Sequence, residues 1–376
     1  MVDEIVIVDT GSSDATLEIA RSHKAKIVQH RWREDFSDAR NVSLAHATSD
    51  WILFLDADEV LDVKSAERLT EMLTHTTHFG FFFCIYNIKE HGFVTGRHFI
   101  TRLFRNLKGV RFAGKIHEHV IPMGTRAYAG MRIYHYGYDL DPETMKRKKE
   151  RNAHILGRAL TENREDPVLR YHLANTHRLL GNYEEAMEHA RKGMELMEKS
   201  GDKTSLYLTI IHVLAEACCQ LGEWNKAEAY CVKALDIRDD FIDALYTLAR
   251  VYKIKRNYRQ TLLTCHTFLE KKRLIDCEPE RGFFFRCLTS WGREAEVRND
   301  LGGIFYENGN LERAIEEVKK AIALLPYDAG AHCNLGSVLA AKGQLREAEE
   351  SFKKALEIKP AYPDAEEGLK RIGASP

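Results

Sequence analysis

The stretch that decides the fold of the first half is Trp51-Ile52-Leu53-Phe54-Leu55-Asp56-Ala57-Asp58-Glu59. Its five leading apolar residues are typical of a strand that is buried on both faces of a parallel sheet. Three carboxylates follow within four residues. Because ligands bind beyond the carboxyl ends of strands in open α/β sheets, these acids are candidates for holding a hard divalent cation and a phosphate-bearing ligand. The alternative is a solvated acidic turn, since short motifs of this kind arise easily by chance.

The residues before this stretch predict a parallel sheet that is built from βαβ units. Apolar, β-branched runs indicate strands, and helical spacing with Ser and Asp caps indicates helices. The expected elements are a strand at Glu4–Asp9, a helix at Ala15–Ser22, a strand at Lys26–Gln29, a helix at Phe36–Thr48 and the strand at Trp51–Leu55. Alternating strands and helices with short links are typical of a parallel sheet.

After Leu61 the pattern changes to longer strands of antiparallel character. They are expected at Phe79–Ile88, Phe99–Phe104, Gly109–Phe112, Ile116–Pro122 and Arg132–Tyr136. Arg102 and Arg105 in this region are either phosphate clamps or surface residues. His117 and His119 share one face of a strand and so permit a zinc site, but neither a His-Glu-x-x-His helix nor a third spaced ligand accompanies them.

Three motifs in the same order resemble glycosyltransferase family 2. They are Val8-Asp9-Thr10-Gly11-Ser12-Ser13-Asp14, Asp38-Ala39-Arg40-Asn41 and Asp50-Trp51-Ile52-Leu53-Phe54-Leu55-Asp56-Ala57-Asp58-Glu59. The resemblance implies a GT-A fold that acts on nucleotide-activated sugars. It also implies that Asp9 contacts the nucleotide base or ribose, and that Asp56 and Asp58 position the ribose and a metal-bound diphosphate. Arg40 would by similarity lie near the nucleotide, and its alternative is a solvated position on a helix.

Two further segments resemble those of family-2 members that carry helical repeats. They are Lys115-Ile116-His117-Glu118-His119 and Ile133-Tyr134-His135-Tyr136-Gly137-Tyr138. Sugar transfer needs a general base for the acceptor and a cation for the departing diphosphate. Glu118 is the candidate base, and His135 would complete the metal shell or touch the diphosphate. The alternatives are a salt-bridged strand end for Glu118 and a satisfied core position for His135.

One departure from the family pattern concerns the start of the domain. Family members normally begin with another strand, a helix and an acidic loop before the segment that matches Glu4–Asp9. We therefore expect an N-terminally truncated glycosyltransferase domain, in which either a central strand is missing or its neighbours have closed up. The catalytic activity of the 376 residues is left open at this point.

The second half repeats itself with a period of 34 residues, as the pairs Gly309 and Gly343 and Pro326 and Pro360 show. This period, with Gly-x-Tyr/Leu-x-x-Ala, indicates tetratricopeptide (TPR) repeats of paired helices. We expect five repeats, an insertion around residues 271–289 and a closing helix that starts at Pro363. The predicted domains are 1–140, a linker helix at 141–165 with a basic run, and the repeats at 166–376.

Repeats of this kind offer a curved groove for a peptide or protein segment, or a surface for association into a homo-oligomer. They supply no catalytic group by themselves. The segment Arg281-Gly282-Phe283-Phe284-Phe285-Arg286 either binds a partner or packs on the stack. The basic run of the linker helix faces either a nucleotide or acidic partner, or the solvent.

Composition excludes several classes of function. With 55 basic and 56 acidic residues, no general attraction to nucleic acid or to a membrane surface is implied. The longest apolar run is too short for a transmembrane segment, and no leader peptide is expected. The eight cysteines form no Cys-x-x-Cys pair, a pattern that fits reduced, buried thiols of a cytoplasmic protein.

These observations predict an α/β domain followed by an all-α array. The predicted function is inverting, Mn²⁺- or Mg²⁺-dependent transfer of a sugar from a nucleotide-diphosphate sugar, with a UDP-sugar as the expected donor. The acceptor is a protein or peptide that the repeats recruit, or a glycan or lipid-linked molecule. The first alternative is an inactive sugar-nucleotide-like domain on a TPR scaffold. A sugar nucleotidyltransferase is disfavoured, because its Gly-rich phosphate loop is not visible.

Overall fold

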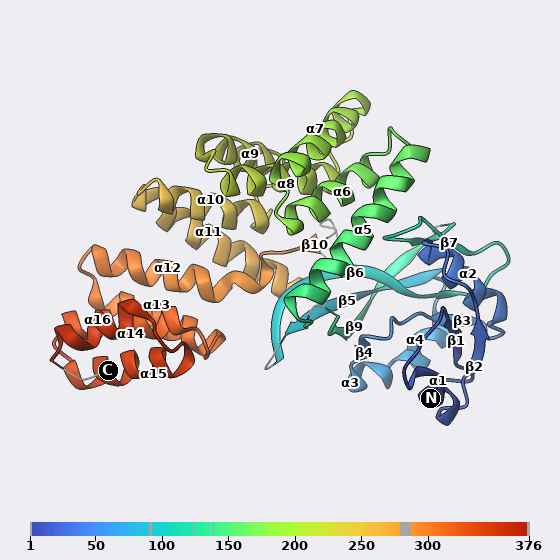
Figure 1. The fold of residues 1–376 in the computed structure, drawn as a ribbon, viewed down its shortest axis with the longest axis horizontal. Coiled ribbons are helices and arrows are strands. Elements are labelled where there is room, and N and C mark those ends of the chain that lie inside the picture. The colour runs from blue at the N-terminus through green and yellow to red at the C-terminus, as the bar shows by residue number, and fades with distance from the viewer. Residues whose placement is uncertain (1, 90–91, 123, 138, 279–286, 374–376) are drawn as a thin grey trace. The chain divides into compact units, whose positions relative to one another are not determined.

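The computed structural model of the chain describes residues 2–89, 92–122, 124–137, 139–278 and 287–373 (Figure 1). Its packing divides the chain into two compact units. Residues before Cys218 form most of the first unit, and residues from Cys218 onward form most of the second. The first unit thus holds the strand-rich half together with the first helices of the array. The domain limits 1–140, 141–165 and 166–376 stay a prediction.

The first unit begins with a small parallel sheet. Strands β1 (Val6–Asp9) and β2 (Lys26–Gln29) pair in parallel, with Asp9 opposite Gln29. Helix α1 (Thr16–Ser22) connects them, and helix α2 (Phe36–His46) follows β2. The Asp35 carboxylate caps α2 by accepting a hydrogen bond from the Asp38 amide. The four predicted elements of this segment are therefore confirmed, with β2 at its predicted bounds.

The next strand departs from the prediction. Strand β3 (Trp51–Leu53) pairs antiparallel with the long strand β6 (Phe93–Arg105). The expectation of a third parallel strand beside β1 and β2, buried on both faces, is wrong, because all three residues of β3 are only half-buried. The side chains of Trp51 and Leu53 instead pack against the core of the sheet that contains β6. Long-range pairing with β6 outweighs the local strand–helix–strand pattern.

This larger sheet is mixed and forms the centre of the first unit. Its strands run in the order β6-β5-β9-β4, with β3 paired to β6. The remaining bounds are β5 (Gly80–Lys89), β9 (Arg126–His135) and β4 (Glu59–Leu61), with helices α3 (Val63–Ala66) and α4 (Leu69–His75) between β4 and β5. Strands β5 and β9 are parallel, so the antiparallel expectation is wrong for this pair, whereas β4 and β9 are antiparallel. The fully buried side chains of Phe83, Ile85 and Ile133 form the core.

A second antiparallel pair carries the predicted Glu118 segment. Strands β7 (Arg111–Ala113) and β8 (His119–Ile121) enclose a loop at residues 114–118. Ile116 of this loop packs against Ile155 and Leu156 of helix α5 (Pro142–Glu162). As predicted, α5 begins with Asp141 as its cap and Pro142 at its first position. The loop is thereby anchored on a helix of the same unit.

Paired helices make up the rest of the described chain. The pairs are α6 (Pro167–Leu180) with α7 (Tyr183–Ser200), α8 (Ser205–Gln220) with α9 (Trp224–Ile237), α10 (Ile242–Ile254) with α11 (Tyr258–Cys277), α12 (Glu294–Glu307) with α13 (Leu311–Leu324), and α14 (Ala329–Ala341) with α15 (Leu345–Ile358). Helix α16 (Pro363–Arg371) follows them. The five predicted helix pairs and the closing helix are confirmed.

The insertion lies between α11 and α12. Its described part contains β10 (Cys287–Leu288) and the 3-10 helix η3 (Trp291–Arg293). The Arg281–Arg286 segment lies outside the described residues, so its two interpretations stay open. The Asp243 carboxylate of α10 accepts hydrogen bonds from the amides of Thr289 and Ser290, and these bonds fix the chain just before α12.

Small residues allow the helices of the array to approach closely. Gly336 of α14 lies so near the Phe352 ring of α15 that a Cβ atom would come within 2.8 Å of it. Ala348 and Ala355 beside Phe352 are fully buried. These small side chains let α14 and α15 pack in direct contact.

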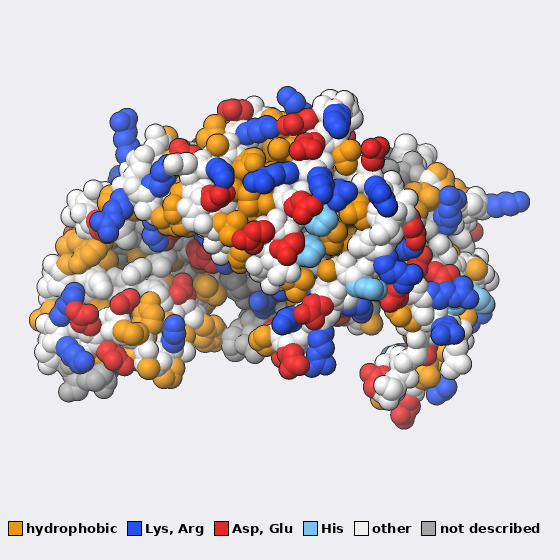
Figure 2. All heavy atoms as spheres, turned by 45° about the horizontal axis from the view of Figure 1, so that its top comes forward, with side chains coloured by type: hydrophobic (Ala, Val, Ile, Leu, Met, Phe, Trp, Pro, Cys, Tyr) orange, Lys and Arg blue, Asp and Glu red, His pale blue; other side chains and the backbone are white. Residues whose placement is uncertain are grey.

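On the face drawn in Figure 2, basic and acidic side chains are interspersed, in keeping with totals of 55 and 56. Over the part of the chain that the structure describes, no helix has the length and apolarity that crossing a membrane requires. Of the seven cysteines whose burial the structure describes, six are buried.

Candidate active site

Asp56 and Asp58 lie in the connection from β3 to β4, and Glu59 is the first residue of β4. Pairing of β4 with β9 places Glu59 opposite His135, and the Tyr136 amide donates a 2.9 Å hydrogen bond to the Asp58 carbonyl. This ladder brings two predicted site residues together, since Asp58 Oδ2 lies 3.4 Å from His135 Nε2. The Asp58 side chain is 40% exposed, so it is open to a ligand.

The imidazole of His135 is held on its other side by Asn87, whose Oδ1 lies 3.0 Å from Nδ1. When Nδ1 donates to Asn87, Nε2 of the neutral ring presents a lone pair toward the Asp58 carboxylate. A proton or a metal ion between Nε2 and Oδ2 then satisfies both groups, as in metal sites whose His ligands are oriented by a second hydrogen bond. The hydrogen bond with His135 also lowers the pKa of Asp58 below its ordinary value.

Gly137 closes the back of this corner. A Cβ atom on Gly137 would come within 1.9 Å of Asp58 Oδ2 and 2.7 Å of His135 Nε2. No side chain fits at this position unless one of the two groups moves. Glycine here keeps the Asp58–His135 pair, which we call the Asp58 corner, in its geometry.

A network of carboxylates and guanidinium groups lies beside the corner. Arg40 Nη2 donates to Asp56 Oδ1 at 2.8 Å and to Glu118 Oε1 at 2.6 Å. Arg102 Nη2 donates to Asp56 Oδ2 at 2.7 Å and to Glu59 Oε1 at 2.5 Å. The structure therefore joins three predicted site residues, which come from α2, from the acidic stretch and from the loop before β8.

Burial sets the protonation behaviour of this network. The side chains of Glu118 and Glu59 are 7% and 2% exposed, and desolvation raises the pKa of each carboxyl above its ordinary value. Desolvation also lowers the pKa of Arg40, whose guanidinium stacks over the Phe54 ring at 4.1 Å. Attraction between Arg40 and Glu118 opposes both shifts. Glu118 thus combines a raised pKa with a specific charge partner, the combination that marks candidate acid–base residues.

Asp9 lies at the end of β1, as predicted, and is buried. Its Oδ1 accepts a 3.0 Å hydrogen bond from the Ser12 amide, and hydrogen bonds from Ser12 lower its pKa. Asp9 is therefore an ionised group within its own turn. The role of Asp9 in nucleoside binding stays a prediction.

Three residues of the site region have roles that sequence reasoning missed or left open. Glu59 belongs to the acidic stretch but was given no role of its own from the sequence. In the structure it is a buried partner of Arg102. Arg102 is buried, so the surface alternative is wrong for it. His98 lies four residues before Arg102 on β6. Burial lowers the pKa of His98 to about 3, and the positive charges of Arg102 and His135 act in the same direction. Because side chains alternate between the two faces of a strand, His98 and Arg102 lie on the same face of β6. This spacing is the feature of the sequence that could have placed His98 beside Arg102.

Two other basic residues lie away from this network. Arg105 donates hydrogen bonds to the carbonyls of Thr76 and His78 and stacks over Trp51. It therefore holds the segment between α4 and β5 against β3 and β6. The His117 ring stacks on His172 of α6 at 3.8 Å, which joins the Glu118 loop to the first helix of the array within the first unit.

The donor set fits a cation that takes most of its ligands from elsewhere. Of the residues that the structure describes, no three His, Cys, Asp or Glu side chains are grouped so as to hold a metal ion. Mg²⁺-type sites in phosphate chemistry need only one or two protein ligands, because phosphates and water supply the rest. Asp58 and His135 fit that requirement.

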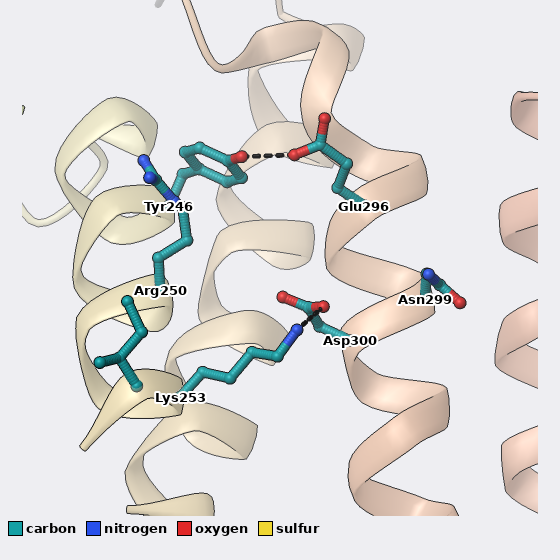
Figure 3. Close-up of a pocket in the computed structure, with 7 residues that line it drawn as sticks. Tyr246, Arg250, Lys253, Glu296, Asn299 and Asp300 are labelled. Atoms are coloured by element: carbon teal, nitrogen blue, oxygen red, sulfur yellow. Dashed lines mark hydrogen bonds and ion pairs between the residues drawn. The ribbon is translucent and has the colours of Figure 1, made fainter. Parts of the chain in front are cut away.

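A separate cavity of about 430 Å³ lies between α10 and α12 in the second unit (Figure 3). Six of its seven lining residues carry a polar or charged group, and both signs of charge are present. The lining residues are Tyr246, Arg250, Lys253, Ile254, Glu296, Asn299 and Asp300. The Lys253 ammonium pairs with Asp300 at 2.5 Å, and the Tyr246 hydroxyl hydrogen-bonds to Glu296. Figure 3 shows these groups pointing across the gap between the two helices.

Comparison with protein families assigns the two halves separately. Residues 1–136 match the family described as glycosyl transferase family 2. Residues 167–240, 302–343 and 329–362 match three models of tetratricopeptide repeats. The first match contains all six predicted site residues.

Individual proteins show the same two similarities. The SPbeta prophage-derived glycosyltransferase SunS of Bacillus subtilis is 28% identical over 340 residues, which cover 84% of this chain and 77% of SunS. A TPR repeat-containing protein of Synechococcus elongatus is 34% identical over 45% of this chain and 44% of its own length. A solved structure of YrrB, described as a TPR protein with an unusual peptide-binding site, covers 58% of this chain and 99% of YrrB, with 21% identity and a TM-score of 0.43.

Proposed function

We propose that this chain, whose residues 1–136 match glycosyl transferase family 2 and are followed by tetratricopeptide repeats, is an inverting, metal-dependent glycosyltransferase. Its proposed donor is a nucleotide-diphosphate sugar, with a UDP-sugar as the expected one. The observation that carries the proposal is the Asp58 corner, an exposed carboxylate just before β4 that lies 3.4 Å from an imidazole nitrogen. The Arg40–Asp56–Glu118 network directly beside it supports the same proposal.

Donor binding is assigned to the acidic stretch and to β1. Asp58 and His135 would hold Mn²⁺ or Mg²⁺, which when bound supplies charge stabilisation to the departing diphosphate. Asp56 is oriented by two guanidinium groups and is proposed to accept hydrogen bonds from the ribose. Asp9, which is ionised within its own turn, is proposed to contact the nucleoside.

Glu118 is the proposed general base. Its carboxylate takes the proton of the acceptor while the acceptor atom forms the new bond to the anomeric carbon. The bond from that carbon to the diphosphate oxygen breaks at the same time, and its electron pair leaves with the diphosphate. A single displacement of this kind inverts the anomeric centre. The raised pKa of Glu118 brings the carboxylate closer to the operating pH, where a base is most effective.

The repeats are proposed to recruit a protein or peptide acceptor. The cavity between α10 and α12 supports this part of the proposal, because it offers amide, hydroxyl and charged groups to an extended segment. Association of two chains through the array is the alternative use of this surface. The buried thiols of the described residues are compatible with the proposed cytoplasmic location.

Sugar-nucleotide hydrolysis tests the site assignment. We expect Asp58→Ala to abolish hydrolysis of UDP-sugars, and Glu118→Gln to lower the rate by about 100-fold or more, as the loss of a general base does. The surface variant Glu143→Gln, on an exposed first turn of α5, is the matched carboxylate control. Unchanged rates in both site variants would remove the assignment.

One observation favours a second candidate, a scaffold whose sugar-nucleotide domain is inactive. Asp56 and Glu118 already have charge partners within the chain, in Arg40 and Arg102. A site closed in this way would bind no nucleotide. Calorimetric titration of the folded chain with UDP and Mn²⁺ separates the two candidates, because only the enzyme releases binding heat.

A further inference from the structure

The basic run at the start of α5 is the feature that the proposed function has not used. It comprises Lys146, Arg147, Lys148 and Lys149, followed by Arg151. Sequence reasoning left open whether it faces a ligand or the solvent. The structure separates its members by what each side chain contacts.

Most of the run has partners away from the Asp58 corner. Lys146 and Arg147 are 69% exposed and pair with glutamates of their own helix. Lys149 donates to the Leu179 carbonyl at 3.0 Å, and Arg151 stacks over the Phe36 ring. These four residues are surface or packing positions.

Lys148 is different, because its Nζ donates to the carbonyl of Gly137 at 3.3 Å. Gly137 is the residue that closes the back of the Asp58 corner, with no room for a Cβ atom between it and the Asp58 carboxylate. The ammonium group therefore lies beside the one exposed carboxylate of the site, within the same unit of the chain. Its positive charge also lowers the pKa of Asp58, which agrees with this proximity.

We infer that Lys148 binds the diphosphate of the sugar nucleotide and holds the leaving group beside the Asp58 corner. The inference rests on the proposed function. A ligand whose phosphates reach a cation at Asp58 and His135 comes to lie against the Lys148 ammonium. Lysine is a strong point-charge partner for phosphate, and its flexible stem adapts to the oxygen that it meets.

The bond from Lys148 to the Gly137 carbonyl is weaker than the one that a phosphate oxygen offers. A length of 3.3 Å is at the long end for an N–H···O bond, and the acceptor is a neutral carbonyl. A bond to a phosphate oxygen is charge-assisted and about twice as strong. Exchange of the Gly137 carbonyl for a phosphate oxygen therefore strengthens this one bond. Lys148 would then stabilise the charge that the diphosphate gains as the sugar leaves.

The test compares Lys148→Met, Lys148→Gln and Lys148→Arg with Lys146→Met in the full chain. Lys146→Met removes the same charge from the same helix at an exposed position. It therefore separates the effect of the position of Lys148 from the effect of losing one positive charge. Lys148→Gln keeps a donor for the Gly137 carbonyl but loses the charge, and so preserves a purely structural role. Calorimetry with Mn²⁺ measures the Kd of UDP, GDP, CDP and ADP, and of the nucleoside that corresponds to the tightest of them.

We expect Lys148→Met and Lys148→Gln to weaken binding of that diphosphate by about 10- to 100-fold, the value of one charge-assisted bond. Binding of the nucleoside should not change, Lys148→Arg should recover most of the loss, and Lys146→Met should bind as the unaltered chain does. Unaltered diphosphate binding in Lys148→Gln, or an equal loss for the nucleoside, would overturn the inference alone. An unaltered chain that binds none of the four diphosphates would contradict the proposed function as well.

Discussion

Replacing Arg102 by Met tests whether the buried network beside the Asp58 corner is held together by charge. The substitution keeps the apolar stem but removes the guanidinium that Glu59 and Asp56 share. Glu59 is the costly partner, because its side chain is 2% exposed, whereas Asp56, at 34%, can turn to water. Loss of one member of a buried ion pair typically destabilises a protein by about 3–5 kcal/mol.

The pKa of Glu59 gives an upper limit for its share of this loss. The carboxyl can always escape the penalty by taking up a proton, and its ordinary pKa is 4.5. Neutralising such a group costs about 3.4 kcal/mol at pH 7 and about 0.7 kcal/mol at pH 5, at 1.36 kcal/mol per pH unit. Burial already raises the pKa of Glu59, so the folded state favours the protonated carboxyl, and this contribution is lost as the pH rises. Arg102→Met should therefore lose about 3 kcal/mol at pH 7 and under about 1 kcal/mol at pH 5.

Native-state hydrogen exchange of peptides from β3 and β6 is the assay, because it reports the opening free energy of this sheet separately from the helices. Arg105→Met is the control on the same strand. Its guanidinium bonds to backbone carbonyls, so we expect a loss of about 1 kcal/mol that does not depend on pH. The double variant with Glu59→Gln should lose the pH dependence. Equal losses for Arg102→Met at pH 5 and pH 7 would refute the reasoning.

Three further predictions follow from named contacts. The pH–rate profile of the unaltered enzyme should lose activity on its acid side at a pH above 4.5, because burial raises the pKa of Glu118 and a base acts only when deprotonated; an acid limb below 4.5 would argue against Glu118. Gly137→Ala should lower transfer by about 100-fold through displacement of the Asp58 corner, with Gly157→Ala, which meets open space, as the unaffected control. Gly302→Ala should destabilise the second unit by about 1–3 kcal/mol in urea unfolding, since its Cβ would lie 2.3 Å from Val318, whereas Gly303→Ala should be neutral or stabilising; equal effects would refute this packing argument.

The helical half was predictable from the sequence because its information is local and repeated. The 34-residue period predicts where each helix pair turns, as Gly309 and Gly343 show, and the recurring Ala of the motif, such as Ala348, marks a position that must be small. Each repeat contacts mainly its neighbours, so the helix pair predicted for one repeat also predicts the next. Five pairs and a closing helix follow without knowledge of any distant contact.

The sheet was harder, because strand pairing is not local. Apolar runs predicted most strands of the first half, but nothing in the Trp51–Leu55 run states that its partner is β6 rather than β1. The same limit applies to the site. Asp58 and His135 were both named, yet only the register of β4 against β9 makes them neighbours.

Burial of charge was the other gap. Arg102 and Arg105 are alike in sequence, and only packing makes the first a buried partner of carboxylates and the second a partner of backbone carbonyls. Lys148 likewise cannot be told from Lys146 until α5 is placed beside Gly137. Pairs of this kind make matched controls, because the two side chains have the same chemistry and differ only in their position in the fold.

The central claim is that the carboxylate of the Asp58 corner grips a nucleotide diphosphate through a divalent cation. Calorimetric titration of the unaltered chain and of Asp58→Asn with UDP, each in Mn²⁺ and in EDTA, tests it most directly. We expect saturable binding for the unaltered chain in Mn²⁺, and binding that is at least about tenfold weaker in EDTA and in Asp58→Asn. Equal affinity in all four titrations, or no binding by the folded chain, would contradict it.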